Sequence, residues 1–258
     1  RTLQVATYHH YKDQWANEFN LSYEDTEGNT KPCHQTTFGM SERLLGAVVG
    51  MHGDDKGLIL PPSIAPFQVV IMPVASHKDE NVIPAAQNLC RELVSKGIRA
   101  KLDSRDVRPG VKHYDWEIKG VPIRVELGPR DISSGKCVTT MRTGGKSEIN
   151  LENASQQLID MLDQISDELR TRASSLISDL VRTFPLDSIS EDQTIDSLIE
   201  DGIVYEIPFN GNDSDAEFLE KKTGLTLLGE CDDSYAKERK CIVTGESTFK
   251  RCFMARMY

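Results

Sequence analysis

Arg43 is the side chain whose type and position point most directly to chemistry. It follows Gly39 and Ser41 in the stretch GMSERLLGAVVG, where the glycine frees the backbone, the serine can cap a helix, and apolar residues recur at helical spacing. Arg43 is therefore predicted in the first helical turn, where unpaired N–H groups and the helix dipole favour an anion. Because a guanidinium presents a planar fork of donors, we predict a phosphate-binding group. The alternative is a surface arginine beside Glu42.

The residues around Arg43 form a longer pattern. GMSER at 39–43 is followed by HGDD at 52–55 and by GLILPP at 57–62. This order resembles the third signature motif of class II aminoacyl-tRNA synthetases, and its details resemble prolyl-tRNA synthetases of the archaeal and eukaryotic type. The chain is similar to the carboxy-terminal part of that family. The resemblance implies activation of L-proline with ATP to prolyl-adenylate, followed by transfer to tRNA(Pro), with Mg²⁺ accompanying ATP.

The stretch QVATYHH at 4–10 resembles a family strand with the pattern Q-x-x-T-x-H. The resemblance implies that Gln4, Thr7 and Arg43 bind ATP, with Arg43 as the catalytic residue that holds the γ-phosphate. It also implies that Gln4 and Thr7 face the terminal adenosine of tRNA. The implied proline-binding residues are His9, Phe38, Gly39 and Ser41. Taken alone, His9 and His10 are better explained as solvated loop histidines.

Three further stretches resemble the anticodon-binding domain that several class II synthetases share: DVRPGVK at 106–112, WEIKGVP at 116–122 and ELGPRD at 126–131. Single-stranded bases are read along their edges and stacked on aromatic or guanidinium planes. Cations suit phosphates or guanine, and a carboxylate accepts from exocyclic amines. The anticodon-binding candidates are Arg105, Lys119, Arg124, Glu126 and Arg130. The alternative is that these residues form ordinary surface ion pairs, Arg124 with Glu126 and Lys119 with Glu117.

The last part of the chain resembles the carboxy-terminal domain of the same family, in which many members bind structural zinc through a C-x4-C and a C-x2-C pair. The corresponding positions here are Asn210, Asp215, Cys241 and Thr244. One thiolate cannot complete a tetrahedral site, so we predict that structural zinc is absent. Cys231 and Cys252 lie off the pattern and could at most complete an irregular site. The apolar core candidates are Leu225, Leu227 and Leu228, and the resemblance implies that Tyr258 folds back towards the active site.

The elements that position these residues are predicted from periodicity. A strand is expected over 1–7, a hairpin over 21–33, and a helix over 156–184 with a break near 173–175. Between 66 and 155 strands alternate with helices, which is typical of a compact α/β domain with a mixed sheet. The predicted fold is α/β and α+β, with four parts: the end of a class II antiparallel-sheet catalytic domain (1–65), an anticodon-binding domain (66–155), a connecting helix (156–189) and a small α+β zinc-domain-like module (190–258).

Composition limits the class of protein. The 258 residues are 38% hydrophobic and 27% charged, with a net charge of -10, which is ordinary for a globular protein and argues against one that coats nucleic acid. No run approaches the ~18 apolar residues of a membrane helix. Six cysteines without paired spacing, in a sequence lacking an apolar signal core, favour reduced thiols in a cytoplasmic protein.

The resemblance predicts a proline–tRNA ligase that acts on L-proline and tRNA(Pro), and it implies a homodimer. We expect no membrane partner. The sequence begins inside a predicted strand and lacks the first family motif and the arginine loop of the second. We expect it to be an incomplete piece that is inactive alone. The alternatives are a non-catalytic tRNA-binding accessory or regulatory protein derived from a synthetase, and an acidic ATP-binding regulator without RNA.

Overall fold

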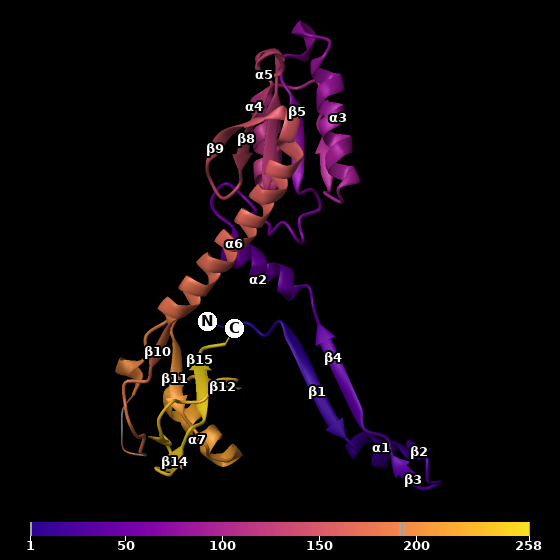
Figure 1. Cartoon of the computed structure of the whole chain (residues 1–258). Helices are drawn as coiled ribbons and strands as arrows, with labels where there is room; N and C mark the ends of the chain where they lie inside the picture. The colour runs from indigo at the N-terminus through magenta and orange to yellow at the C-terminus, as the bar shows by residue number, and fades with distance from the viewer. Residues whose placement is uncertain (1, 191, 193–194, 258) are drawn as a thin grey trace. The chain divides into compact units, whose positions relative to one another are not determined.

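The computed structural model describes residues 2–190, 192 and 195–257. The chain divides into two compact units, one of residues 45–174 and the other of residues 1–44 with 175–258. Figure 1 shows the order of the elements along the chain. Within the described residues, no helix is both long and apolar enough to cross a membrane.

The amino-terminal segment is a two-stranded antiparallel ribbon. Strand β1 (Ala6–Lys12) pairs with β4 (Gln35–Met40). Between them lie α1 (Gln14–Phe19) and the expected hairpin, formed by β2 (Ser22–Glu24) and β3 (Thr30–Pro32). The prediction of a strand over 1–7 was wrong, because the ladder opposite β4 begins only at Ala6. Before it, Thr2 forms an isolated bridge with Met257.

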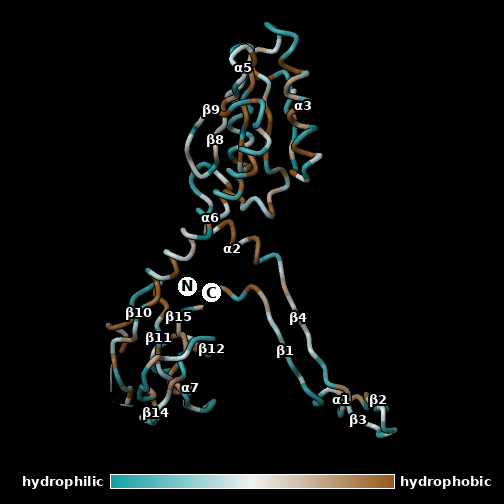
Figure 2. Tube along the Cα trace, in the orientation of Figure 1, coloured by the Kyte–Doolittle hydropathy of each residue, from teal (hydrophilic) through white to brown (hydrophobic). Residues whose placement is uncertain are grey.

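Helix α2 (Arg43–His52) follows the ribbon and is apolar along much of its length, as Figure 2 shows. Its start confirms the predicted cap, because the Ser41 hydroxyl oxygen accepts a hydrogen bond from the Arg43 N–H at 3.4 Å. At the other end, His52 is buried. Burial, and secondarily the positive charge of Arg172, lowers the pKa of this imidazole. The helix therefore begins with an exposed cation and ends inside the fold.

The unit of residues 45–174 is built on a five-stranded mixed sheet, as predicted, in the order β6-β5-β7-β8-β9. Its strands are β5 (Val69–Pro73), β6 (Ala100–Leu102), β7 (Ile123–Leu127), β8 (Lys136–Met141) and β9 (Lys146–Asn150). β5 runs parallel to both neighbours, whereas β8 and β9 are antiparallel. The helical elements are η1 (Ser76–Lys78), α3 (Val82–Ser95), α4 (Pro109–Ile118), α5 (Pro129–Ser134) and η2 (Leu151–Asn153).

Two clusters of apolar side chains hold this sheet. On one face, alternate residues of β5 and β7 pack with α3 and with α6 (Ala154–Leu180), and the cluster extends from Ile59 to Leu169. On the other face, Trp116 of α4 packs on Val70 and Met72. The core of the α/β unit therefore includes both the segment after α2 and the first half of α6.

Helix α6 differs from its prediction in two ways. It is continuous through 173–175, where a break was expected, and it ends at Leu180 because Val181–Thr183 form strand β10. Its first half carries the buried residues of the α/β core, whereas Leu176 and Ile177 in the second half are exposed. Serines near 174 are weak helix formers but do not break a helix that is already anchored by packing.

The carboxy-terminal part is a small α+β fold around a four-stranded sheet in the order β10-β11-β15-β12. Its remaining elements are β11 (Val204–Pro208), α7 (Asp213–Thr223), β12 (Thr226–Glu230), β13 (Arg239–Lys240), β14 (Ser247–Thr248) and β15 (Arg251–Ala255). Before β11 lies the short 3-10 turn η3 (Asp196–Leu198). Leu225 is buried and Leu227 packs beside the core, but the prediction for Leu228 was wrong because it is 40% exposed.

Candidate nucleotide-binding and anticodon-binding sites

The register of the ribbon brings Thr7 and Gly39 together. The two residues are direct partners in the β1–β4 ladder, so they share one face. A Cβ atom at position 39 would lie 3.0 Å from the Thr7 hydroxyl oxygen. A glycine therefore leaves the threonine hydroxyl room to lie over the backbone of β4.

A hollow of about 220 Å³ lies at this end of the ribbon, and its lining includes Gln4, Thr7, Gly39, Ser41 and Arg43. The structure thus brings all three predicted ATP-binding residues together with two of the predicted proline-binding residues. Arg43 is exposed in the first turn of α2. A guanidinium beside a helix amino terminus suits an anionic group such as a phosphate.

The other two predicted proline-binding residues, His9 and Phe38, lie on opposite faces of the ribbon. His9 is opposite Thr37, whereas Phe38 is opposite Tyr8 with ring centroids 4.8 Å apart. Successive side chains of a strand point to opposite faces, so His9 and Phe38 occupy opposite faces of the ribbon. Phe38 is 79% exposed. The structure therefore does not bring the aromatic ring and the histidine together.

An aromatic hollow of about 630 Å³ was missed by the sequence analysis. It is lined by Tyr11, Trp15 and Phe19, with His34 and neighbouring residues of β4. The rings of Trp15 and Phe19 are parallel within 3° and 5.7 Å apart. Their i, i+4 spacing indicated a helix, but nothing in the spacing showed that the helix would leave this aromatic face open.

In the α/β unit, Arg124 and Glu126 lie on the same face of β7 and meet at one residue of α4. Arg124 Nη1 donates to the His113 carbonyl oxygen at 2.7 Å, and a Glu126 carboxylate oxygen lies 3.1 Å from His113 Nε2. Both side chains are half-buried. Within the described residues, neither is ion-paired with the other, and Arg124 lies 4.0 Å from Glu117. The structure therefore brings a cation and a carboxylate together at the edge of α4.

Arg105 is held in place by acidic neighbours. Its guanidinium donates to both carboxylate oxygens of Asp103, at 2.9 and 2.7 Å, and to Asp115 at 2.7 Å. Asp103 is buried and also accepts from the Trp116 indole N–H at 2.7 Å. The hydrogen bonds from Arg105, and then from Trp116, hold the pKa of Asp103 well below its usual range. Lys119 lies over the Trp116 ring, 4.8 Å from its centroid.

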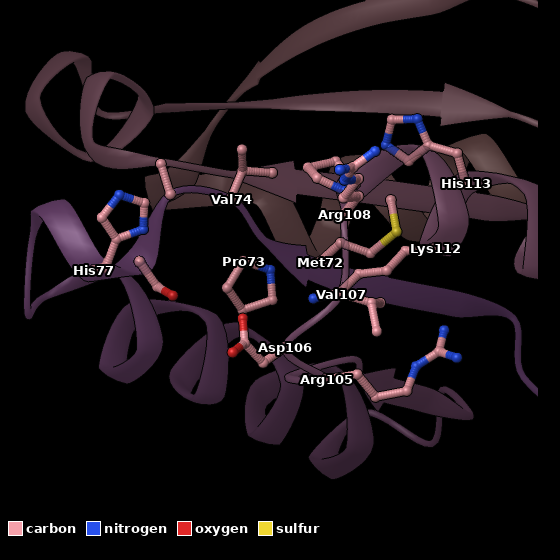
Figure 3. Close-up of a pocket in the computed structure, with 13 residues that line it drawn as sticks. Met72, Pro73, Val74, His77, Arg105, Asp106, Val107, Arg108, Lys112 and His113 are labelled. Carbon is pink, nitrogen blue, oxygen red and sulfur yellow. The ribbon is translucent and has the colours of Figure 1, made fainter.

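Arg105 also lines a pocket of about 490 Å³ at the carboxyl end of β5, shown in Figure 3. Sequence reasoning missed its other basic residues, His77, Arg108 and Lys112, which come from the loops after β5 and β6 and from α4. In open α/β sheets this edge is where ligands bind. The available signal was that His77 and Arg108 fall in the segments that follow β5 and β6. Arg130 is exposed in the first turn of α5.

The four positions at which the resemblance predicts lost zinc ligands, Asn210, Asp215, Cys241 and Thr244, contact one another or cap a helix. Cys241 Sγ accepts from the Asn210 N–H at 3.5 Å, and the Thr244 hydroxyl donates to the Asn210 side-chain oxygen at 3.2 Å. An Asp215 carboxylate oxygen accepts from the backbone N–H of Asn212 at 2.9 Å in the capping box of α7. Among the described residues, no group of three or more His, Cys, Asp and Glu side chains is placed to hold a metal ion.

Of the off-pattern cysteines, Cys252 lies on β15 and Cys231 directly follows the neighbouring strand β12. The Cys231 N–H donates to the Arg251 carbonyl oxygen at 2.7 Å, and the Cys252 thiol is 3.8 Å from the Phe209 carbonyl oxygen. Burial raises the pKa of Cys252 to about 11. All six cysteines are unpaired in the structure, and the reduced state stays a prediction.

Comparison with known proteins identifies these parts. Residues 68–161 match the family model described as an anticodon-binding domain. The chain is 41% identical to the proline–tRNA ligase of Methanoregula boonei over 95% of its own length, and 40% identical to that of Thermococcus kodakarensis over 100%. It also superposes on a Giardia lamblia prolyl-tRNA synthetase in complex with prolyl-adenylate, with a TM-score of 0.86 and 26% identity over the whole chain.

The chain is homologous to part of the prolyl-tRNA synthetases. It spans about half the length of the relatives it matches: 51% of the Methanoregula protein, 54% of the Thermococcus protein and 56% of the Giardia chain. The predicted resemblance and the predicted mixed α/β fold are confirmed. The roles of individual residues stay predictions.

Proposed function

We propose that this chain is part of a ligase that activates L-proline with ATP and transfers it to tRNA(Pro). The observation that carries the proposal is the hollow in which Gln4 and Thr7 meet Arg43. It places an exposed guanidinium, at the start of a helix, beside polar side chains of the neighbouring strand. Together with similarity to proline–tRNA ligases along the whole chain, this arrangement favours a nucleotide phosphate over a simple surface arginine.

In the proposed first step, MgATP is a substrate and a carboxylate oxygen of proline attacks its α-phosphorus. A bond to pyrophosphate breaks, and proline and AMP are joined in a mixed anhydride. Arg43 would hold the γ-phosphate and balance the charge that develops on the departing pyrophosphate, which is the kind of stabilisation that lowers such barriers most. Gln4 and Thr7 would position the nucleotide for in-line attack.

In the second step, a ribose hydroxyl of the terminal adenosine of tRNA attacks the activated carbonyl and AMP leaves. Gln4 and Thr7 would then face that adenosine. His9, Gly39 and Ser41 are proposed to bind proline near the same end of the ribbon. Phe38 is proposed as the aromatic wall of the proline pocket, and its place on the opposite face makes it the first of these assignments to test.

Anticodon recognition is proposed for the α/β unit. Arg124 and Glu126 are half-buried on one sheet face, where a cation can contact guanine or phosphate and a carboxylate can accept from an exocyclic amine. Arg105, Lys119 and Arg130 would add cationic contacts. The pocket at the carboxyl end of β5 is concave and basic enough to accept an unstacked nucleotide;.

Because the chain spans about half of its relatives, we propose that it is inactive by itself and acts when joined to the remaining half. We further propose that the complete protein is a cytoplasmic homodimer and that it uses ATP with Mg²⁺ but no structural zinc. The alternative, a tRNA-binding accessory protein, is favoured by one observation. The α/β unit has its own continuous core, whereas the ribbon leaves Tyr8, Phe38 and Met40 exposed.

The deciding experiment is proline-dependent ATP–pyrophosphate exchange by the chain alone and by the chain rejoined to its missing half. We expect exchange only in the rejoined protein, and a loss of at least about 100-fold on Arg43→Ala. Arg170→Ala is the matched control, because this arginine is 76% exposed and, among the residues that the structure describes, forms an ion pair with Asp167 on its own helix alone. Absence of exchange in the rejoined protein, with tRNA binding retained and insensitive to Arg43→Ala, would favour the accessory protein.

A further inference from the structure

Arg142 is a buried arginine that the proposed chemistry does not use. It follows β8, its side chain is 5% exposed, and its guanidinium forms a bidentate pair with the Asp54 carboxylate. The same guanidinium donates to the carbonyl oxygens of Gly57 and Glu117, both at 3.2 Å. Arg142 therefore joins the turn after α2 to the end of α4. A bidentate, charge-assisted contact of this kind fixes orientation as well as distance.

The turn from Asp54 to Gly57 is closed on itself and pressed against α4. Reciprocal backbone hydrogen bonds of 3.1 and 3.0 Å join Asp54 and Gly57, and the Leu58 N–H donates to the Ile118 carbonyl oxygen at 3.0 Å. Gly57 has a φ of +134°, and a Cβ atom there would lie 2.5 Å from Ile118 Cα. Hence the turn is docked at a distance that only glycine permits.

Gly120, after α4, lies similarly close to the segment that follows the turn. Its φ is +69°, and a Cβ atom at this position would lie 2.7 Å from the backbone of Leu58. The Leu60 N–H then donates to the Gly120 carbonyl oxygen at 3.4 Å. The segment after the turn is therefore attached to the end of α4 and the residues after it by the backbone hydrogen bonds of Leu58 and Leu60. The side chain of Arg142 holds the start of this segment.

The turn from Asp54 to Gly57 is connected to residues of both proposed sites, Arg43 through helix α2 and Arg124 through Arg142. Two residues before Asp54, helix α2 ends, and the first residue of that helix is Arg43. Arg142 also shares a cavity of about 430 Å³ with the anticodon candidate Arg124 and with Lys56 and Lys146. The ion pair thus connects the end of the phosphate-binding helix to the wall of the proposed anticodon site.

We propose that Arg142 is a positioning residue that, through Asp54, makes aminoacylation depend on a correctly bound anticodon. The inference rests on the proposed function. Because the pair holds the end of α2 against the sheet that carries Arg124, it relates the proposed anticodon site to the carboxyl end of α2, the helix whose first residue is Arg43. Loosening the pair should weaken that relation without removing any group from either site.

The test is a double perturbation in the rejoined enzyme, with tRNA(Pro) and a tRNA(Pro) variant carrying one changed anticodon base. Asp54→Asn keeps the shape of the side chain and removes its charge, and Arg142→Lys removes the fork of donors. Lys136→Gln is the matched control, because it breaks an exposed 3.3 Å pair with Glu148 on the same β8–β9 hairpin, away from the turn that carries Arg142. Exchange without tRNA, charging kcat/KM for each tRNA, and thermal unfolding are measured for every variant.

Couplings between sites typically amount to about 5- to 150-fold. We expect the penalty for the changed anticodon to fall at least about fivefold in Asp54→Asn and Arg142→Lys, while exchange without tRNA stays within about twofold. Lys136→Gln should leave the penalty unchanged. A penalty equal to that of the unmodified enzyme, with only the unfolding temperature lowered, would give Arg142 a purely structural role and overturn the inference. Unmodified enzyme without any exchange would instead overturn the proposed function.

Should Arg142→Lys fail to fold, Asp54→Asn carries the test, because Asp54 is 38% exposed and its amide replacement is solvated at that position.

Discussion

Replacing Asp103 should expose how strongly the anticodon candidate Arg105 is tied into the fold. Asp103→Ala removes the acceptor of the buried Trp116 indole N–H, and leaving such a donor unsatisfied costs about 1–3 kcal/mol;. The lost pair with Arg105 adds at most about 1 kcal/mol, because the arginine side chain is 46% exposed and regains water;. We therefore expect a total loss of about 1–4 kcal/mol in the free energy of unfolding.

Asp103→Asn should be milder, about 1–2 kcal/mol, because the amide oxygen still accepts from Trp116 while its NH₂ group faces the guanidinium. The sign of the pH dependence follows from the depressed pKa of Asp103 in the folded protein. Its contribution is complete above the unfolded value of about 3.9 and is lost as the pH falls towards the folded value. The stability difference between the unmodified chain and Asp103→Asn should narrow below about pH 4.

Urea unfolding followed by Trp116 fluorescence measures these losses, in a Trp15→Phe background that leaves Trp116 as the single reporter. The reasoning would be refuted by an Asp103→Ala loss below about 1 kcal/mol. It would equally be refuted by a difference between the unmodified chain and Asp103→Asn that is the same at pH 6 and pH 2.5, because such a difference would not come from an ionised carboxylate.

Three other substitutions and treatments test separate parts of the fold. Gly57→Ala should destabilise the α/β unit by about 3 kcal/mol in thermal unfolding, because its Cβ would lie 2.5 Å from the last residue of α4;. The control Gly46→Ala, on α2 with open space around it, should stabilise the chain by about 0.5–1 kcal/mol;. Burial raises the pKa of Cys137 to about 12, so iodoacetamide at pH 8 should spare this thiol until urea unfolds the chain. Burial and the Glu206 carboxylate raise the pKa of Tyr235. In an alkaline absorbance titration, Tyr235→Phe should therefore match the unmodified chain near pH 10. It should show one ionising tyrosine fewer only at pH values well above 10.

Local patterns predicted most elements but not their pairing. The apolar run of β5, the alternation along β7 and the helical spacing of α3 and α6 indicated most of the α/β unit, because each pattern is repeated over many buried residues. The first strand was misplaced because residues 1–7 alternate, whereas the strand itself covers residues 6–12, where two adjacent histidines break the alternation. Only the ladder with β4 decides between two such readings, and that partner lies over twenty residues away.

The candidate site shows the same division. The local sequence was enough to predict that Arg43 lies in the first turn of a helix and that Ser41 caps this helix. Which face of the ribbon Phe38 occupies depends on register, and the register is not visible from one strand;. The ion pair between Arg142 and Asp54 could not be predicted for a similar reason, because Asp54 is 88 residues away and lies in a turn.

The ribbon that carries Thr7, Gly39 and Arg43's neighbours has a consequence for how activity could be lost. Two paired strands with Tyr8, Phe38 and Met40 exposed have little burial to hold them, and such ribbons are only marginally stable in isolation. Catalytic groups, however, must be held to within about half an ångström. Every side chain of the proposed site could thus be present and chemically intact while the rate stays low, because the ribbon that positions these side chains samples many conformations. If the proposed function holds, stiffness of the ribbon would then limit the rate, and surfaces that pack on its apolar face would contribute to catalysis alongside the residues proposed to bind ATP.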